Sequence, residues 1–108
     1  MTYCLLKKYL KQIRMKKYLI KREMPGISLE SQEKLQEAGK NSESVLVKMR
    51  SEGKNINQVQ SYIAGDCIFC VYRAESTELI REHGERSHFP VSEISEISDV
   101  VEHDTSDN

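Results

Sequence analysis

The sequence lacks several features that would place a protein of 108 residues in a familiar functional class. It has no apolar run near the roughly 20 residues that a transmembrane helix needs. Its three cysteines are an odd number, and Cys67 and Cys70 share one predicted strand, where a bridge between them would be strained. We therefore expect reduced thiols and a cytoplasmic location. The chain has the length of one domain, and no complete catalytic signature occurs in it.

Acidic residues are absent from the first 22 positions, which carry eight Lys or Arg. The rest of the chain holds eight basic and 17 acidic residues, so the net charge of −1 conceals a basic start and an acidic body. The segment from Glu93 onward has six acids and no Lys or Arg. Because phosphate recognition needs a basic face, this acidic body argues against nucleic acid as a partner.

The two ends of the chain differ in composition from its middle. Residues 1–14 form a basic N-terminal extension whose apolar residues recur at helical spacing. Such a segment is typical of an amphipathic helix that touches a membrane surface or a partner, and it is equally compatible with an extension ahead of the folded domain. We favour the second interpretation and expect no membrane partner. We expect one domain over residues 15–101 and an acidic, disordered tail over 102–108.

Hydrophobic periodicity and turn residues divide the middle of the chain into six elements. Alternating apolar residues predict strands, apolar residues three and four positions apart predict helices, and Pro, Gly and Ser mark the boundaries. The order is βαββαβ, the ferredoxin-like arrangement of the α+β class, in which two helices lie on one face of a four-stranded antiparallel sheet. The expected elements are a strand over 16–24, a helix from an N-cap at Ser28 to Gly53, strands over 56–63 and 67–73, a helix from Ser76 to the Phe89-Pro90 stop, and a strand over 92–101.

The third predicted strand is apolar on both faces. One face carries Ile68, Cys70 and Tyr72, and the other carries Cys67, Phe69 and Val71. Two helices can cover only one face of the sheet, so the second face needs another cover. We therefore expect a symmetric homodimer that packs sheet against sheet or shares an edge strand.

Four segments of the sequence resemble, in order, the motifs of one family of small bacterial proteins. They are Tyr18 to Gly26 (YLIKREMPG), Ser61 to Ala74 (SYIAGDCIFCVYRA), Ile80 to His83 (IREH), and Phe89-Pro90 together with Ile94 to Ile97 (ISEI). The family was long classed as a domain of unknown function and includes nickel-binding proteins. The resemblance implies a ferredoxin-like α/β dimer that binds a divalent metal. The sequence departs from the family pattern at Lys21, Gln58 and Cys67, where the family usually has an acid, an aromatic residue and a lysine.

The candidate metal ligands are His83, Glu82, Cys70, Tyr62 and His88. A neutral imidazole binds Ni²⁺, Zn²⁺ or Cu²⁺ well, and a neighbouring carboxylate can complete a mixed site. Purely structural interpretations exist beside these, with His83 as a half-buried histidine and Cys70 as part of the core. His88 follows His83 by five positions, so the two share a site only if the helix end bends or a second subunit contributes. The Cys-x-x-Cys spacing typical of a redox pair falls within a strand rather than at a helix N-terminus, which argues against that chemistry.

Three functions fit these observations. The first is a cytoplasmic protein that binds Ni²⁺, or Zn²⁺ or another divalent metal, for storage, buffering or delivery. The second is an enzyme of the dimeric α/β-barrel type that acts on a small ligand with His83 or Tyr72 as acid or base, an idea that rests on fold analogy. The third is a regulatory interaction module. The absence of a nucleophile–base pair and of any cofactor motif weighs against an enzyme, and the resemblance favours metal binding.

Overall fold

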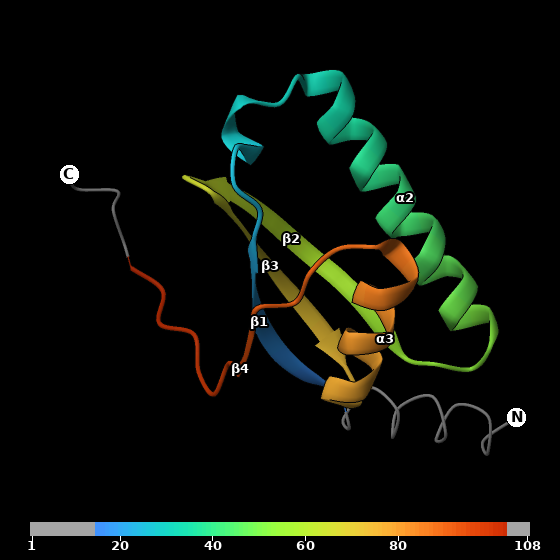
Figure 1. The fold of residues 1–108 in the computed structure, drawn as a ribbon. Helices are drawn as coiled ribbons and strands as arrows, with labels where there is room; N and C mark the ends of the chain where they lie inside the picture. The colour runs from blue at the N-terminus through green and yellow to red at the C-terminus, as the bar shows by residue number, and fades with distance from the viewer. Residues whose placement is uncertain (1–14, 104–108) are drawn as a thin grey trace, which may run out of the picture.

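The computed structural model describes residues 15–103, so the expectations for residues 1–14 and for the end of the acidic tail lie outside the described residues. Within them the chain forms four strands, a short 3₁₀ helix and two α-helices (Figure 1). In chain order these elements are β1 (Lys16–Glu23), η1 (Ile27–Leu29), α2 (Gln32–Ser51), β2 (Ile56–Ala64), β3 (Cys67–Ala74), α3 (Thr77–Ser87) and β4 (Glu93–Glu96). Neither described α-helix is long and apolar enough to cross a membrane.

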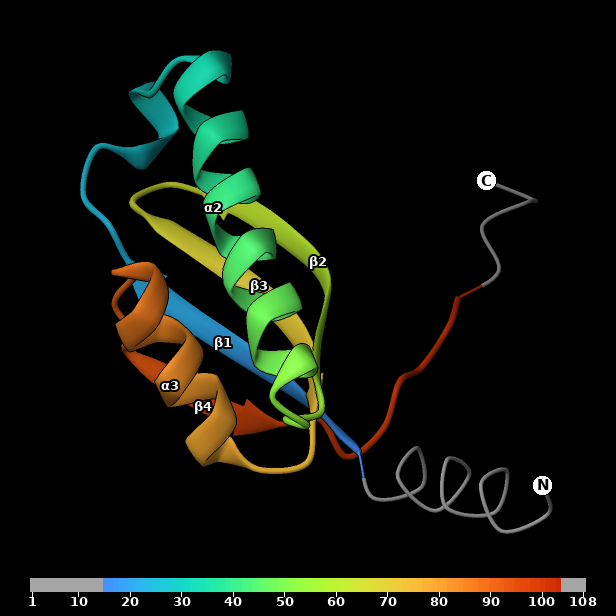
Figure 2. The same cartoon turned by 90° about the vertical axis from the view of Figure 1, so that its right-hand side faces the viewer.

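The four strands form one antiparallel sheet in the order β2-β3-β1-β4. The central strands β1 and β3 pair along their whole length, from Lys16 opposite Ala74 to Glu23 opposite Cys67. Both α-helices lie on the same side of this sheet (Figure 2). The predicted ferredoxin-like arrangement of the α+β class is therefore confirmed.

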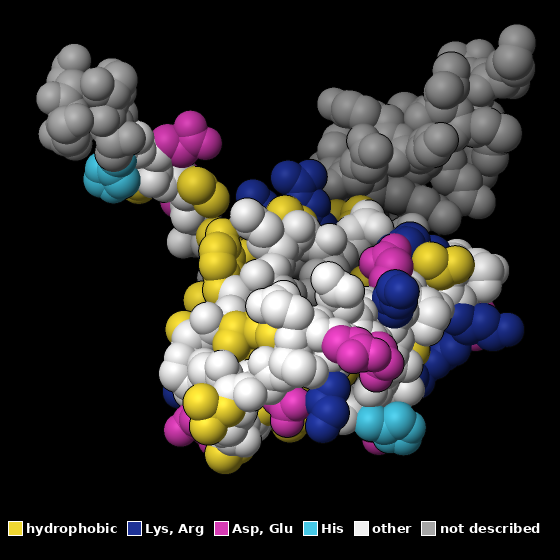
Figure 3. Space-filling model, turned by 90° about the horizontal axis from the view of Figure 1, so that it is seen from above, with side chains coloured by type: hydrophobic (Ala, Val, Ile, Leu, Met, Phe, Trp, Pro, Cys, Tyr) yellow, Lys and Arg dark blue, Asp and Glu magenta, His cyan; other side chains and the backbone are white. Residues whose placement is uncertain are grey.

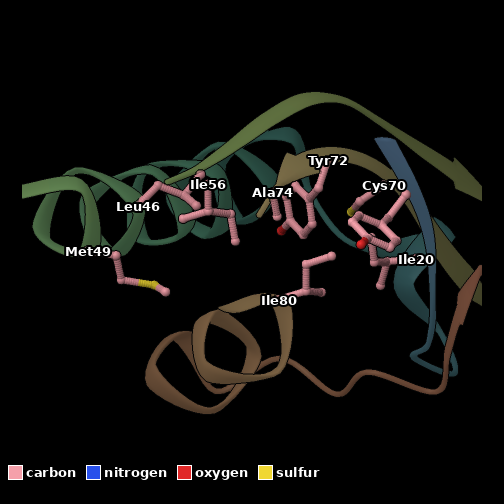
Figure 4. Close-up of a cluster of buried hydrophobic side chains, with 9 residues drawn as sticks. Ile20, Leu46, Met49, Ile56, Cys70, Tyr72, Ala74 and Ile80 are labelled. Carbon is pink, nitrogen blue, oxygen red and sulfur yellow. The ribbon is translucent and has the colours of Figure 1, made fainter. Parts of the chain in front are cut away.

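The hydrophobic core lies between the sheet and the two helices (Figure 4). The helix α2 contributes Ser42, Leu46 and Met49, which recur three or four residues apart on its inner face as the periodicity predicted. In the strands, every second residue points toward the helices, because alternate side chains share a face. The buried hydrophobic side chains of this core are Tyr18, Ile20, Leu46, Met49, Ile56, Cys70, Tyr72, Ala74 and Ile80.

The long helix begins later than the sequence indicated. Its N-cap is Ser31, whose side chain accepts a hydrogen bond from the backbone N–H three residues on, and not Ser28. The chain turns at Gly26, which has a positive φ of 84°, and then forms η1, which buries Ile27. The Ser28 hydroxyl donates a hydrogen bond to the Gly65 carbonyl in the β2–β3 turn. That contact fixes Ser28 outside the helix, so Ser31 supplies the cap.

The last strand is shorter than the sequence indicated. It covers Glu93–Glu96 rather than residues 92–101, and it pairs with the middle of β1. The apolar residues of this segment recur every three positions, which does not match the two-residue alternation of a strand. As a result Ile94 packs against the core, whereas Val100 is 56% exposed.

The sheet face that points away from the helices also carries apolar side chains. Leu19 lies opposite Val71, and Tyr62 lies opposite Phe69. Leu19 and Tyr62 are 38% and 51% exposed. The two-sided apolar character predicted for β3 is present, and the homodimer inferred from it stays a prediction.

Candidate functional site

The helix α3 places a histidine inside the core. Ile80, His83 and Ser87 recur on its inner face at helical spacing, and all three are buried. The His83 ring has no exposed surface and meets the Tyr72 ring edge-on, with the ring centroids 5.5 Å apart. His83 is thus more deeply buried than the half-buried position that the sequence suggested.

Both ring nitrogens of His83 have hydrogen-bond partners. Nε2 lies 3.1 Å from the Ser42 carbonyl oxygen, and Nδ1 lies 3.1 Å from the Tyr72 hydroxyl. A carbonyl can only accept, so Nε2 carries the proton and Nδ1 accepts from the tyrosine. Burial lowers the pKa of His83, and the Arg22 charge adds to this effect against the opposing hydrogen bond to Ser42. The imidazole is therefore neutral at physiological pH.

A buried arginine lies next to this pair. Arg22 in β1 is 2% exposed, and its guanidinium donates to the Tyr72 hydroxyl and to the Pro90 carbonyl, each at 2.9 Å. Its central carbon also lies 5.8 Å and 5.9 Å from the ring centroids of Tyr72 and Phe89. Among residues 15–103 it forms no ion pair with a carboxylate. Burial raises the pKa of Tyr72 to about 12, so the hydroxyl that Arg22 contacts is neutral.

The hydrogen bonds continue from Ser42 along the wall of a cavity. The Ser42 hydroxyl donates to Gln58 Oε1 at 3.0 Å, and the Gln58 amide donates to the Ser61 hydroxyl. That hydroxyl in turn donates to the Cys70 Sγ at 3.3 Å. These groups, with Arg22 and the Tyr72 ring, border a cavity of about 350 Å³ between α2 and the sheet. The arrangement can hold and orient a polar group at one side of an otherwise apolar space.

Glu82 lies outside this cavity, in an ion-pair network at the surface. Its carboxylate lies 2.6 Å from the Lys54 Nζ and 2.9 Å from the Arg86 guanidinium, and both cations also pair with Glu52. Hydrogen bonds from Lys54 and then from Arg86 lower the pKa of Glu82. A metal ion bound by this carboxylate would have to compete with both cations.

The other three candidate ligands lie in separate places. Cys70 is 2% exposed and belongs to the core and to the cavity wall. Tyr62 lies on the opposite face of the sheet, where its hydroxyl donates to Gln60 at 2.9 Å. His88 is the exposed C-cap of α3, with a positive φ of 62°. The five candidates therefore do not meet within one chain, and the described residues hold no group of three His, Cys, Asp or Glu side chains that fits a metal ion.

Comparison with known proteins identifies the family. The family described as "Nickel responsive protein SCO4226-like" matches residues 18–97, which cover most of the sheet and both helices. The chain belongs to this family. The resemblance inferred from the four sequence motifs is thereby confirmed.

A solved structure shares the fold of this SCO4226-like chain. The crystal structure of SCO4226 from Streptomyces coelicolor A3(2) matches 79% of this chain and 99% of that chain, with a TM-score of 0.63 and 22% sequence identity. At this identity the likeness supports the fold and does not assign a site. No curated protein matches the sequence.

Sequence reasoning misses two residues of the candidate site, Arg22 and Ser42. The sequence signal for Arg22 is a charged residue on the inward face of the first strand, two positions from Ile20. Ser42 lies on the inner face of α2, and a hydroxyl among apolar neighbours indicates a buried polar contact. Neither sequence signal reveals the hydrogen-bond partner of the residue, because each partner comes from a distant segment of the chain.

Proposed function

We propose that this chain binds a divalent metal ion, with Ni²⁺ preferred, and stores, buffers or delivers it in the cytoplasm. The observation that supports this proposal is membership in a family described as nickel responsive, over residues 18–97. Imidazole nitrogen and thiolate sulfur are ligands that suit Ni²⁺ and its neighbours in the transition series. His83 is the ligand we favour, because its imidazole is neutral and its Nδ1 carries no proton.

Metal binding at His83 requires a rearrangement of its hydrogen bonds. The Nδ1 lone pair accepts the Tyr72 hydroxyl proton at 3.1 Å. Releasing this bond leaves the buried Tyr72 hydroxyl without its acceptor and costs about 1–3 kcal/mol, which is small beside the binding free energy of a tight metal site. Cys70, Glu82, Tyr62 or His88 would complete the site, either by movement within the chain or from a second copy.

The proposal is tested by titrating the tag-free protein with Ni²⁺, Zn²⁺ and Co²⁺ in a calorimeter, with metal content measured on the same sample. We expect stoichiometric, submicromolar Ni²⁺ binding that His83→Ala weakens by at least about tenfold. The control is His103→Ala, which removes an exposed histidine and should leave the affinity unchanged. Weak binding without preference among the three metals would overturn the proposal.

Because His83 is buried, its substitution needs a check on folding by circular dichroism and thermal melting. Unchanged Ni²⁺ affinity in a folded His83→Ala protein removes His83 from the site. The same titration on His88→Ala then tests the exposed histidine, whose loss cannot disturb the core.

We also propose that two copies of the chain associate through the open faces of their sheets. Leu19, Tyr62, Phe69 and Val71 place apolar surface there, and a second copy offers the matching surface. Light scattering at micromolar concentration should report a dimer. Val71→Lys should convert it to a monomer, whereas Val47→Lys, at an exposed valine of α2, should not. A monomeric wild-type protein would refute this assembly.

A further inference from the structure

The cavity of about 350 Å³ lies between η1, α2 and the sheet and has a volume common among small-molecule sites. Most of its wall is apolar, and the apolar side chains that line it include Met24, Ile27, Leu35, Ile63, Ile68 and Phe89. Two exposed lining residues, Glu30 and Lys34, pair with each other at 3.7 Å. Seen from the end of the molecule where η1 lies, acidic and basic side chains are mixed among apolar ones (Figure 3). The space therefore suits a ligand with a largely apolar body.

One positive charge on the cavity wall has only neutral partners. The Arg22 guanidinium donates to the Tyr72 hydroxyl and the Pro90 carbonyl, and neither acceptor carries a negative charge. A guanidinium has five N–H donors, so the described residues leave most of them without an acceptor. Buried charges in proteins are normally paired with an opposite charge, because removal from water is costly. An anionic group in the cavity would supply that missing partner.

We propose that this cavity binds a small organic carboxylate, whose charged group pairs with Arg22 and whose apolar body lies against Ile68, Leu35 and Phe89. A planar carboxylate matches the fork of a guanidinium and can accept two of its N–H groups at once. Contacts with Tyr72 and Phe89 hold the guanidinium in place, so little side-chain entropy is lost when the anion binds. Tyr72 from β3 and Phe89 from the segment after α3 both line this cavity. This site adjoins the nickel site proposed above, because the Tyr72 hydroxyl contacts both Arg22 and the His83 Nδ1, and the charge of Arg22 favours an anion over a metal cation there.

The test compares three probes that share one apolar body: octanoate, octan-1-ol and octylamine. Each is titrated by calorimetry into the full-length protein after treatment with a chelator, so that metal binding plays no part. We expect octanoate to bind one per chain, at least about tenfold more tightly than either of the other two probes. Equal affinity for octanoate and octan-1-ol would mean that the cavity is only apolar and would overturn the proposal.

Two variants locate the octanoate site. Arg22→Gln should weaken octanoate binding by at least about tenfold and leave octan-1-ol binding unchanged, whereas Lys40→Gln, at an exposed lysine of α2 that does not line the cavity, should change neither. Ala38→Phe fills the cavity from α2 while Arg22 is kept, and it should abolish octanoate binding. Its matched control is Gln36→Phe on the exposed face of the same helix. Octanoate binding that survives in Ala38→Phe overturns the proposal even if Arg22→Gln does not fold.

Discussion

Acidification should destabilise this protein through His83. Burial lowers the pKa of His83 in the folded chain, whereas the unfolded chain has the ordinary histidine value of about 6.5. Between these two values the unfolded state binds more protons than the folded state, so stability falls as the pH falls. The contribution is fully present above pH 6.5 and declines below it by up to about 1.4 kcal/mol per pH unit. Integrated over the first unit below pH 6.5, the loss is at most about 1 kcal/mol.

The surroundings of the His83 ring explain why a proton is disfavoured there. The charges of Arg22 on β1 and Arg86 on α3 disfavour a protonated His83 ring. Glu43 on α2 favours protonation, but by less than burial disfavours it. A proton on Nδ1 would also end the hydrogen bond that this nitrogen accepts from Tyr72. The Tyr72 hydroxyl cannot compensate by ionising, because its pKa lies at about 12.

Urea unfolding followed by circular dichroism at about pH 7.5, 6.5 and 5.5 measures this effect. The wild-type protein should lose more stability than His83→Gln over the lower unit of this range, by up to about 1 kcal/mol. His103→Gln removes an exposed histidine and should keep the wild-type dependence on pH. If wild type and His83→Gln lose stability equally, the ring does not titrate with a lowered pKa and the reasoning fails.

Three further predictions concern packing and surface charge. Gly84→Ala should reduce the free energy of unfolding by about 1–3 kcal/mol, because the added Cβ would lie only 2.7 Å from the Val91 Cγ2. Leu46→Ala, at a fully buried core position, should cost about 2–5 kcal/mol in the same urea assay, and a loss near zero would contradict the core packing. Glu52→Gln should destabilise the protein at neutral pH and not near pH 2, since a hydrogen bond from Arg86 lowers the pKa of Glu52 from 4.5 to about 2. The stabilisation by Glu52 is thus complete above pH 4.5, is lost as the pH falls through about 2, and should weaken in about 1 M NaCl.

The fold could be predicted from local pattern because burial imposes a period on each element. The spacing of Ser42, Leu46 and Met49 predicted the inner face of α2 correctly, and that face needs no knowledge of the rest of the chain. The helix start could not be predicted in this way. Ser28 and Ser31 are both good N-caps, and the choice between them depends on a contact of Ser28 with Gly65, far away in the sequence.

The candidate site was less predictable than the fold, because its contacts join segments that lie far apart in the sequence. The helix predicted between Ser76 and Phe89-Pro90 includes His83, and the structure places His83 in α3. Its partners come from β1, α2 and β3, so they depend on strand register and on how α2 and α3 pack together. A single sequence contains no local signal for those distances. The adjacent residues Glu82 and His83 suggested a metal site. The sequence likewise contains no signal for the ion pair between Glu82 and Lys54.

The charge of Arg22 should oppose Ni²⁺ binding at His83 and favour carboxylate binding in the cavity. One substitution therefore tests both proposals. The His83 Nδ1 lies 3.1 Å from the Tyr72 hydroxyl, which lies 2.9 Å from the Arg22 guanidinium. A divalent ion on Nδ1 would therefore lie close to a buried positive charge, where like charges repel by more than about 1 kcal/mol at the effective dielectric constant of a protein. Arg22→Gln should then strengthen Ni²⁺ binding by about tenfold, measured by calorimetry, while it weakens octanoate binding. If Ni²⁺ binds tightly and Arg22→Gln leaves its affinity unchanged in a folded protein, the ion lies away from His83. The exposed His88 would then be the histidine ligand to test first.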